Sequence, residues 1–399
     1  MKEGWSYKRF KDICYSISDG DWIEKKDQSN SGIRLIQTGN IGVGKFIPKD
    51  DSRKFISEET FNRLKCCEIY EGDILISRLP NPLGRSCILP QLNTRCITAV
   101  DCSILKIKHE IVLPHYFMYY TQSKGYFSKI ESESSGTTRA RITRKKIEET
   151  IIPVPPLSEQ RSIVTRLDAA FSHIDTLKAN AEKQLNEARK LFQAELTECM
   201  KPKEGWEEKT LKEVGITQTG TTPPKSDTSN YGEYISFIRP AELNFDGMGG
   251  INYESEIKLS EKGVERSRLI KANSILMCCI GSVGKMGFST KEVTCNQQIN
   301  TITPKSNYSP KFVYYAMLDK KFLDDIIKEA KSAQATLPII SKGKWERHKI
   351  HVPYLVEQHS IVSHLDSLSS TIRKLEELQQ KTLAECDALK QAMLREVFE

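Results

Sequence analysis

The sequence has no long hydrophobic run. No stretch of its 399 residues approaches the roughly 20 consecutive apolar residues that a membrane-spanning helix needs. The first ten residues, MKEGWSYKRF, carry charge but lack the apolar segment of a secretory signal peptide. We therefore expect a protein that stays in the cytoplasm. The 11 cysteines form no CxxC pair and show no zinc-finger spacing, so we expect reduced, mostly buried thiols and no metal site.

Motifs of nucleic-acid-modifying enzymes are also missing. There is no Walker A sequence that would bind ATP. Asn81-Pro82-Leu83-Gly84 lacks the second proline and the aromatic residue of the motif that holds a flipped base in methyltransferases, so we interpret it as a turn. Asp50-Asp51 lie in a polar stretch without the Glu-x-Lys of a metal-dependent nuclease, and we interpret them as surface. We expect no catalytic residue and no cofactor in this chain.

The charge of the chain decides little. The formal net charge of +7 is compatible with nucleic acid as a partner, but many basic enzymes have a similar value. The composition, 38% hydrophobic and 28% charged, is that of a globular protein, and the length favours more than one domain.

An internal duplication is the strongest positive signal. The segment IPVPPLSEQRSIVTRLDAAFSHIDTLKA, which starts at Ile152, aligns without a gap with IHVPYLVEQHSIVSHLDSLSSTIRKLEE, which starts at Ile350. The sequence before each copy repeats more loosely; for example, Glu3-Gly4-Trp5 recurs as Glu204-Gly205-Trp206. The duplication predicts two related halves with pseudo-two-fold symmetry. We divide the chain into two globular domains and two helical regions: 1–152, 153–201, 202–350 and 351–399.

The globular parts combine short strands with short helices. Apolar runs bounded by glycine, asparagine and proline predict strands at Ile33–Ile36, Asp73–Ser77 and Ser103–Ile107. Helices are expected around Glu58–Lys65 and Pro114–Lys124. This mixture predicts α+β domains.

A long helix is predicted after each proline-containing turn, with Ser158 as the N-cap of the first. From Ile163 and from Ile361, apolar residues follow the 4-3-4-3 spacing of a coiled coil. Each helix has about 40 residues and would span roughly 60 Å. We expect the two helices to pair antiparallel as a rigid spacer with one globular domain at each end; the alternative is that they hold a homodimer together. The predicted seam includes three leucines at later positions: Leu177, Leu191 and Leu389.

The doubled order of a proline turn, Leu-x-Glu-Gln and a long helix resembles the specificity subunit of type I restriction–modification systems. The matching runs are Val154-Pro155-Pro156-Leu157-Ser158-Glu159-Gln160 and Val352-Pro353-Tyr354-Leu355-Val356-Glu357-Gln358, and Tyr354 departs from the second proline of the pattern. The resemblance implies two target-recognition domains in a non-catalytic subunit that binds double-stranded DNA. It also implies docking of two methyltransferase subunits and, through them, restriction subunits with translocase and nuclease activity. Those partners would use S-adenosylmethionine, ATP and magnesium.

The resemblance assigns the helical regions to partner docking and to the coiled coil. The candidate residues for these roles are Pro155, Glu159, Gln160, Ile163, Leu167, Ile174, Leu177, Pro353, Glu357, Gln358, Ile361, Leu365, Ile372 and Leu375.

Candidate DNA-binding residues come from polar loops. Base edges are read by Arg, Lys, Asn or Gln on loops and helix ends, and phosphates are bound by cations and hydroxyls. The segment from Gly136 to Lys146 is the richest in these types, although it could be only a charged, solvated loop. In the first half the candidates are Gln37, Thr38, Asn40, Arg78, Arg85, Thr138, Arg139, Arg141, Lys145 and Lys146. In the second half they are Arg239, Lys285, Gln297, Gln298, Gln334 and Thr336.

The two sets of candidates differ, which predicts an asymmetric target with two half-sites. Two readers on one face of DNA would contact half-sites roughly one helical turn (~34 Å) apart and leave the bases between them unread. Two other functions remain open. A stand-alone DNA-binding regulator would have no methyltransferase partner, and a coiled-coil scaffold would have no need of two diverged globular domains.

Overall fold

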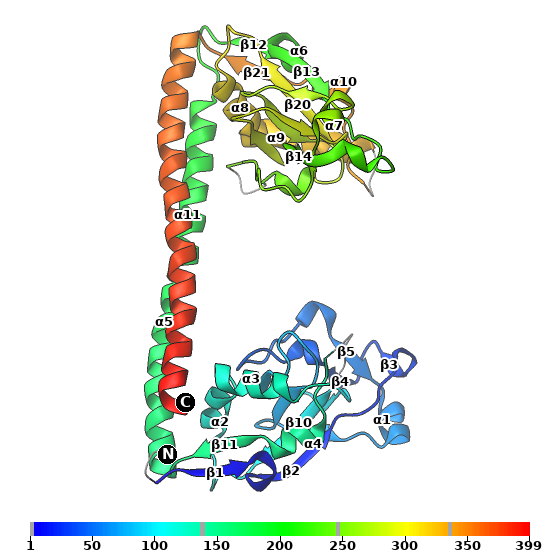
Figure 1. Ribbon diagram of the computed structural model, residues 1–399, viewed down its shortest axis with the longest axis vertical. Coiled ribbons are helices and arrows are strands. Elements are labelled where there is room, and N and C mark those ends of the chain that lie inside the picture. The colour runs from blue at the N-terminus through cyan, green and yellow to red at the C-terminus, as the bar shows by residue number, and fades with distance from the viewer. Residues whose placement is uncertain (1–3, 136–139, 245–247, 334–336) are drawn as a thin grey trace. The chain divides into compact units, whose positions relative to one another are not determined.

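The chain forms two similar compact units in a computed structural model that describes residues 4–135, 140–244, 248–333 and 337–399 (Figure 1). Unit 1 comprises Met1–Ala179 together with Thr382–Glu399, and unit 2 comprises Asn180–Lys381. Each unit therefore contains one globular part and segments of both long helices. Within the described ranges, no helix is long and apolar enough to cross a bilayer.

The globular part of unit 1 contains two main sheets and a two-stranded ribbon. One sheet has the order β2-β10-β7-β8 and the other the order β3-β5-β4-β9-β6, while β1 pairs with β11. All these pairings are antiparallel except that of β4 with β9. The strands are β1 (Ser6–Arg9), β2 (Cys14–Asp19), β3 (Gln28–Ser29), β4 (Ile33–Ile36), β5 (Lys54–Ile56), β6 (Glu68–Ile69), β7 (Ile74–Ser77), β8 (Ser86–Ile88), β9 (Cys96–Thr98), β10 (Cys102–Ile107) and β11 (Ile151–Val154). The helices are α1 (Glu58–Leu64), α2 (Pro114–Tyr120), α3 (Lys124–Ser132) and α4 (Arg144–Glu149).

Unit 2 repeats this topology, except that in its described residues the second sheet has four strands and no counterpart of β3. Its sheets have the orders β13-β20-β17-β18 and β15-β14-β19-β16, and β12 pairs with β21. Again a single pairing, that of β14 with β19, is parallel. The strands are β12 (Glu207–Thr210), β13 (Gly215–Thr219), β14 (Tyr231–Ile238), β15 (Lys258–Leu259), β16 (Leu269–Ile270), β17 (Ile275–Cys278), β18 (Met286–Phe288), β19 (Val293–Cys295), β20 (Ile299–Pro304) and β21 (Lys349–Val352). The helices are α6 (Leu211–Val214), α7 (Glu261–Glu265), α8 (Pro310–Leu318), α9 (Lys320–Ala333) and α10 (Lys342–Trp345). The repeated strand order confirms the predicted α+β class and the doubled architecture.

The predicted strands match β4, β7 and β10 to within one residue at their first residue. The helix expected around Pro114–Lys124 is confirmed as α2, which ends at Tyr120, and a second helix, α3, follows from Lys124. The side-chain oxygen of Ser123 accepts a hydrogen bond from the Tyr126 N–H (3.2 Å) and so caps the start of a new helix. The break lets both helices bury aromatic side chains against the same core, which includes Tyr116, Phe117 and Tyr126.

Two long helices, α5 (Leu157–Cys199) and α11 (Leu355–Phe398), pair within each unit. In unit 1, the Arg166 guanidinium lies 3.3 Å from Glu396, and the Lys390 ammonium lies 2.5 Å from Asp175. Residue numbers thus fall along α11 as they rise along α5. In unit 2, Arg189 lies 2.6 Å from Glu376, which has the same sense. These contacts confirm the predicted antiparallel pairing.

The predicted 4-3-4-3 seam is only partly confirmed beyond its first turns: the same spacing reaches Leu375, which is half-buried, and Cys386, which is 7% exposed, but it misses at other positions. Leu177, Leu191 and Leu389 were expected in the seam, but they are 56%, 68% and 52% exposed. The helix face that is buried recurs every eleven residues instead. In α5 it follows Ile163, Ile174, Leu185 and Leu196, all less than 9% exposed. In α11 it follows Ile361, Ile372, Leu383 and Leu394, of which Leu383 is half-buried.

This periodicity has a simple geometric cause. An eleven-residue repeat has about 3.67 residues per turn, close to the 3.6 of a straight α-helix, whereas a heptad frame at 3.5 drifts unless the helices supercoil to the left. The prediction of Ser158 as N-cap is also wrong, because α5 already begins at Leu157. The Pro156 carbonyl instead accepts hydrogen bonds from the N–H groups of Glu159 (2.9 Å) and Gln160 (3.0 Å).

Candidate nucleic-acid interface

Three loops meet in the globular part of unit 1, and Arg85 joins two of them. Its side chain is buried, with 9% exposure, and burial lowers the pKa of its guanidinium. The guanidinium donates five hydrogen bonds of 2.6–3.0 Å to backbone carbonyls, those of Thr38, Ile41, Leu79, Pro80 and Pro82. Arg85 therefore ties loop 37–41, which follows β4, to loop 78–85, which follows β7.

The third loop, 141–143, attaches to the same region through the backbone. The Ile142 N–H donates to the Arg78 carbonyl (3.3 Å), and the Arg78 N–H donates to the carbonyl of Asp101 (2.8 Å). The Arg141 guanidinium lies 2.8 Å from the carboxylate of Asp101. We call loops 37–41, 78–85 and 141–143 the three-loop site of unit 1. It brings together six of the predicted DNA-binding residues with defined positions, at the ends of sheet strands and just before α4: Gln37, Thr38, Asn40, Arg78, Arg85 and Arg141.

Two arginines of this site are paired with carboxylates. Arg78 is 7% exposed and lies 2.5 Å from Asp19, and Arg141, whose side chain is 41% exposed, is paired with Asp101. In these ion pairs the two carboxylates neutralise the positive charge of the two arginines, which the sequence analysis had counted as available for DNA. The Nε atoms of both arginines have no hydrogen-bond partner among the described residues. Arg78 and Arg85 thus hold the loops in place, whereas Arg141 still reaches solvent.

Loop 37–41 presents one side chain outward and uses another to shape itself. The Gln37 side chain is exposed, while its backbone N–H donates to the side-chain oxygen of Asn40 (2.9 Å). Asn40 is 8% exposed, and its amide nitrogen donates to the carbonyl of Ile47 (2.9 Å). The half-buried Thr38 serves as an acceptor for Arg85. Gln37 is therefore the member of this loop that is placed to touch a ligand.

The basic end of the site lies on α4. Thr143 caps this helix, its side-chain oxygen accepting from the Lys146 N–H (3.4 Å). Lys145 is exposed, and no ion pair involving it occurs in the described part of the chain, while Lys146 lies 3.9 Å from Glu133. Two further predicted residues, Thr138 and Arg139, fall outside the described residues.

Unit 2 builds its corresponding loops with different side chains. The Arg239 N–H donates to the Glu242 carboxylate (2.8 Å), as the Gln37 N–H does to Asn40. The Lys285 ammonium donates to the Pro240 carbonyl (3.4 Å), at the place that corresponds to the Arg85–Thr38 bond. The Ile340 N–H donates to the Cys279 carbonyl (2.9 Å) in place of the Ile142–Arg78 bond. We call loops 239–242, 278–285 and 338–341 the three-loop site of unit 2.

The predicted DNA-binding side chains of unit 2, inside and outside these loops, mostly have partners within the protein. The Arg239 guanidinium lies 2.6 Å from Glu242, itself 5% exposed. The Gln297 side-chain oxygen accepts from the Thr222 hydroxyl (2.5 Å), and that of Gln298 accepts from the Asn296 amide (2.8 Å). The predicted Gln334 and Thr336 lie outside the described residues. The two units thus share a loop scaffold and differ in what it displays.

Gln160 joins the globular part of unit 1 to its own helix. The side chain is fully buried, with 0% exposure. Its oxygen accepts from the Leu113 N–H (2.9 Å), and its nitrogen donates to the carbonyls of Ile111 and Pro155 (2.9 Å each). Next to it, the Trp5 indole N–H donates to the Glu159 carboxylate (3.0 Å).

Unit 2 repeats this junction. The Gln358 side-chain oxygen accepts from the Ser309 N–H (2.8 Å), and its nitrogen donates to the Pro353 carbonyl (2.8 Å). The Trp206 indole N–H donates to Glu357 (3.2 Å). The Glu and Gln side chains of the Leu-x-Glu-Gln motif therefore make hydrogen bonds within each unit. The sequence analysis assigned them to partner docking and did not predict these bonds. The recurrence of Glu-Gly-Trp in the sequence was the signal that could have revealed it.

Further contacts of the same kind involve tyrosines that the sequence analysis did not select. The Tyr119 hydroxyl donates to Asp168 in unit 1, and the Tyr315 hydroxyl donates to Asp366 (2.7 Å) in unit 2. Most of the apolar residues assigned to docking are buried inside the chain itself. These are Pro155, Ile163, Leu167, Ile174, Pro353, Ile361, Leu365 and Ile372, whereas Leu375 is half-buried and Leu177 exposed.

The comparison with family models gives one family, matched twice. The model described as "Type I restriction modification DNA specificity domain" matches residues 2–187 and again 203–384. The two matches cover most of the chain, one in each half of the duplication.

Individual relatives are distant but cover long stretches. The chain is 23% identical over 310 residues to the specificity subunit of the type I restriction enzyme EcoBI from Escherichia coli, a match to 70% of this chain and 64% of that subunit, just under two thirds of its length. It is 22% identical over 427 residues to the StySPI specificity subunit of Salmonella potsdam, covering 100% of this chain and 89% of that subunit.

Two solved structures share the fold. A chain from work on complex assembly and conformational transition of the type I R-M system superposes with a TM-score of 0.74 at 19% identity, covering 100% of this chain and 98% of that chain. The HsdS subunit of Thermoanaerobacter tengcongensis gives a TM-score of 0.52 at 19% identity, covering 100% and 97%.

Proposed function

The chain belongs to the family of type I restriction–modification DNA specificity subunits, which recognise the target sequence for their complex and are not catalytic themselves, and from that premise we propose how it reads DNA. Each unit reads one half-site, and the two half-sites differ. The observation that carries this proposal is the shared loop scaffold with different displayed side chains. A shared scaffold supports equivalent docking on DNA, and different side chains make different base contacts.

Within unit 1, Gln37 contacts a base edge and Lys145 and Lys146 contact phosphates. An amide can pair with adenine through two hydrogen bonds, and ammonium groups bind phosphate without reading sequence. Further contacts come from Thr138, Arg139 and Arg141, which precede α4 in the sequence. Arg78, Arg85, Asn40 and, in unit 2, Lys285 position the loops instead, because their polar groups are already bonded to the protein.

Within unit 2, the proposed reading residues are Arg239, Gln297, Gln298, Gln334 and Thr336. Arg239 keeps 29% of its side chain exposed although it is paired with Glu242, so a guanine edge could replace part of that contact. Gln297 is exposed at the end of β19. The proposed domain limits are those of the sequence prediction: recognition domains at 1–152 and 202–350, and helical regions at 153–201 and 351–399.

The partners are double-stranded DNA, two methyltransferase subunits that modify adenine, and restriction subunits that translocate and cleave DNA with ATP. S-adenosylmethionine, ATP and Mg²⁺ would be bound by those subunits, and the complex would work in the cytoplasm. Family membership supports these partners. Because the seam residues are buried between the helices, the methyltransferase subunits dock on the outward faces of α5 and α11. Three leucines are exposed on those faces: Leu177, Leu191 and Leu389.

Co-purification tests this proposal directly. The chain is expressed with its native partners, and the complex is weighed by native mass spectrometry. Two methyltransferase copies per chain support the proposal, and a Leu177→Asp/Leu191→Asp double variant should lose at least one of them without unfolding. A chain that purifies alone but binds DNA would point to a stand-alone regulator.

A further inference from the structure

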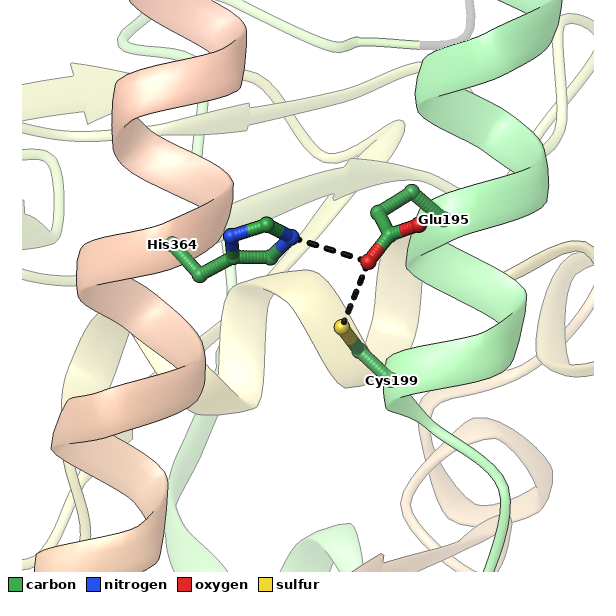
Figure 2. Close-up of side chains that lie close together, drawn as sticks. All are labelled: Glu195, Cys199 and His364. Atoms are coloured by element: carbon green, nitrogen blue, oxygen red, sulfur yellow. Dashed lines mark hydrogen bonds and ion pairs between the residues drawn. The ribbon is translucent and has the colours of Figure 1, made fainter.

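Three side chains from the two long helices converge within unit 2. Glu195 and Cys199 lie one helical turn apart on α5, and His364 faces them from α11 (Figure 2). The His364 Nε2 atom lies 2.8 Å from Glu195 Oε1, and the Cys199 Sγ atom lies 3.9 Å from the same oxygen. One donor atom from each residue fits within 4.8 Å of the others. No other group of three such residues comes together in the part of the chain that the structure describes.

The donor set and its spacing suit zinc. Zinc takes cysteine sulfur at about 2.3 Å, histidine nitrogen at about 2.0–2.1 Å and carboxylate oxygen at about 2.0–2.2 Å, in a tetrahedron. Those bond lengths require the nitrogen and oxygen to be about 3.4 Å apart and the sulfur and oxygen about 3.6 Å apart. The nitrogen–oxygen distance of 2.8 Å is about 0.6 Å too short and the sulfur–oxygen distance of 3.9 Å about 0.3 Å too long for this geometry. Small side-chain rotations would therefore suffice to close the site.

The duplication supplies a control for the simpler interpretation as an ion pair. The residue of the first copy that corresponds to His364 is Arg166, which makes an ordinary ion pair with Glu396 at 3.3 Å. The positions that correspond to Glu195 and Cys199 are Met393 and Val397, and neither residue type is among the usual zinc ligands. Unit 2 therefore has an imidazole, a carboxylate and a thiol at the three positions where unit 1 has a guanidinium, a thioether and an isopropyl group.

We propose that Glu195, Cys199 and His364 form a zinc site that clamps α5 to α11 within unit 2. The three protein ligands leave the fourth position to water. The His364 side chain is 55% exposed, so the ion can enter without opening the core. The expectation of no metal site rested on spacing along the chain, and it could not detect ligands that only helix pairing brings together.

Cobalt titration of the full chain tests the site. The chain is stripped with a chelator, and Co²⁺ is added while a thiolate-to-cobalt absorption band is followed; Zn²⁺ should abolish that band by displacement. In Cys199→Ser the band should be absent. In His364→Ala the affinity should fall at least about 100-fold, because loss of even an outer-shell partner costs roughly 10- to 100-fold. Cys67→Ser and His359→Ala, which remove an exposed thiol and an exposed imidazole elsewhere, should bind like the wild type.

A second measurement avoids variants altogether. Zn²⁺ should protect Cys199 of the wild-type chain from alkylation, as read by peptide mass spectrometry, and should leave Cys67 unprotected. A wild type without the cobalt band, a Cys199→Ser variant that keeps it, or equal alkylation of Cys199 with and without Zn²⁺ would each overturn the proposal. None of these results bears on DNA recognition.

Discussion

Gln160 holds unit 1 to its helix, and its replacement by leucine should be costly. Leucine has a similar volume and suits a buried position, so the loss comes from three backbone groups left without partners. These are the Leu113 N–H and the carbonyls of Ile111 and Pro155. A buried polar group without a partner costs about 1–3 kcal/mol, so three such groups would cost about 3–9 kcal/mol. Single substitutions rarely cost more than about 5 kcal/mol, so we expect Gln160→Leu to destabilise unit 1 by about 3–5 kcal/mol.

That loss is large beside the roughly 5–15 kcal/mol that stabilises a folded domain. At about 2–4 °C per kcal/mol for a domain of this size, the melting temperature of unit 1 should fall by about 6–20 °C. Gln184→Leu makes the same substitution at an exposed position of the same helix and should change stability by less than about 0.5 kcal/mol.

Hydrogen–deuterium exchange gives the local readout. The Leu113 N–H donates to the Gln160 side chain, so its exchange should become fast in Gln160→Leu. The Ser309 N–H, which donates to Gln358 in unit 2, should keep its wild-type protection and serves as the internal reference. Unchanged protection of Leu113 together with an unchanged melting temperature would refute the role of Gln160 as the junction.

Three further predictions follow from the site, the thiols and the helices. Lys145→Ala should weaken binding to all DNA sequences alike and lower the slope of log affinity against log salt by about 1, whereas Lys25→Ala, outside the three-loop site, should not; a sequence-dependent loss measured by fluorescence anisotropy would contradict a phosphate contact. In metal-free native protein, a thiol reagent should modify the exposed Cys67 first and Cys199 more slowly. Burial raises the pKa of Cys87 and Cys102 to about 12, so these two thiols should stay unreactive until the protein unfolds. Early labelling of either one, mapped by mass spectrometry, would contradict their burial. Removal of eleven residues from each long helix, three turns or about 16 Å, should keep the buried face in register and alter the gap tolerated between half-sites, whereas an unchanged gap in a methylation assay would reject helix length as the determinant.

The architecture could be predicted from the sequence because the motif that indicates it occurs twice. Two copies of one motif, each followed by a helical pattern, required two similar units, and strands such as Ile33–Ile36 were bounded by clear turn residues. The position of the seam was harder to predict, because the 3.5- and 3.6-residue periods agree over the first few turns and diverge only later. Leu177 and Leu191 fit the shorter period in sequence, yet they lie outside the buried face.

The candidate site was only partly predictable for a different reason. Base-reading and loop-positioning residues have the same chemistry, so Arg78, Arg85 and Asn40 were selected together with Gln37 and Lys145. The distinction depends on which carbonyls and carboxylates surround each side chain, and Asp19, Asp101 and the loop carbonyls come from distant parts of the chain. No local pattern reveals that environment.

Genome-wide methylation mapping tests the central claim most directly. Cells that express the complete system are compared with cells carrying the chain with Gln37→Ala and with cells that lack the chain. We predict one asymmetric two-part motif in the wild type, its loss without the chain, and relaxed sequence preference in one half of the motif only for Gln37→Ala. A palindromic motif, or methylation that persists unchanged without the chain, would contradict the account.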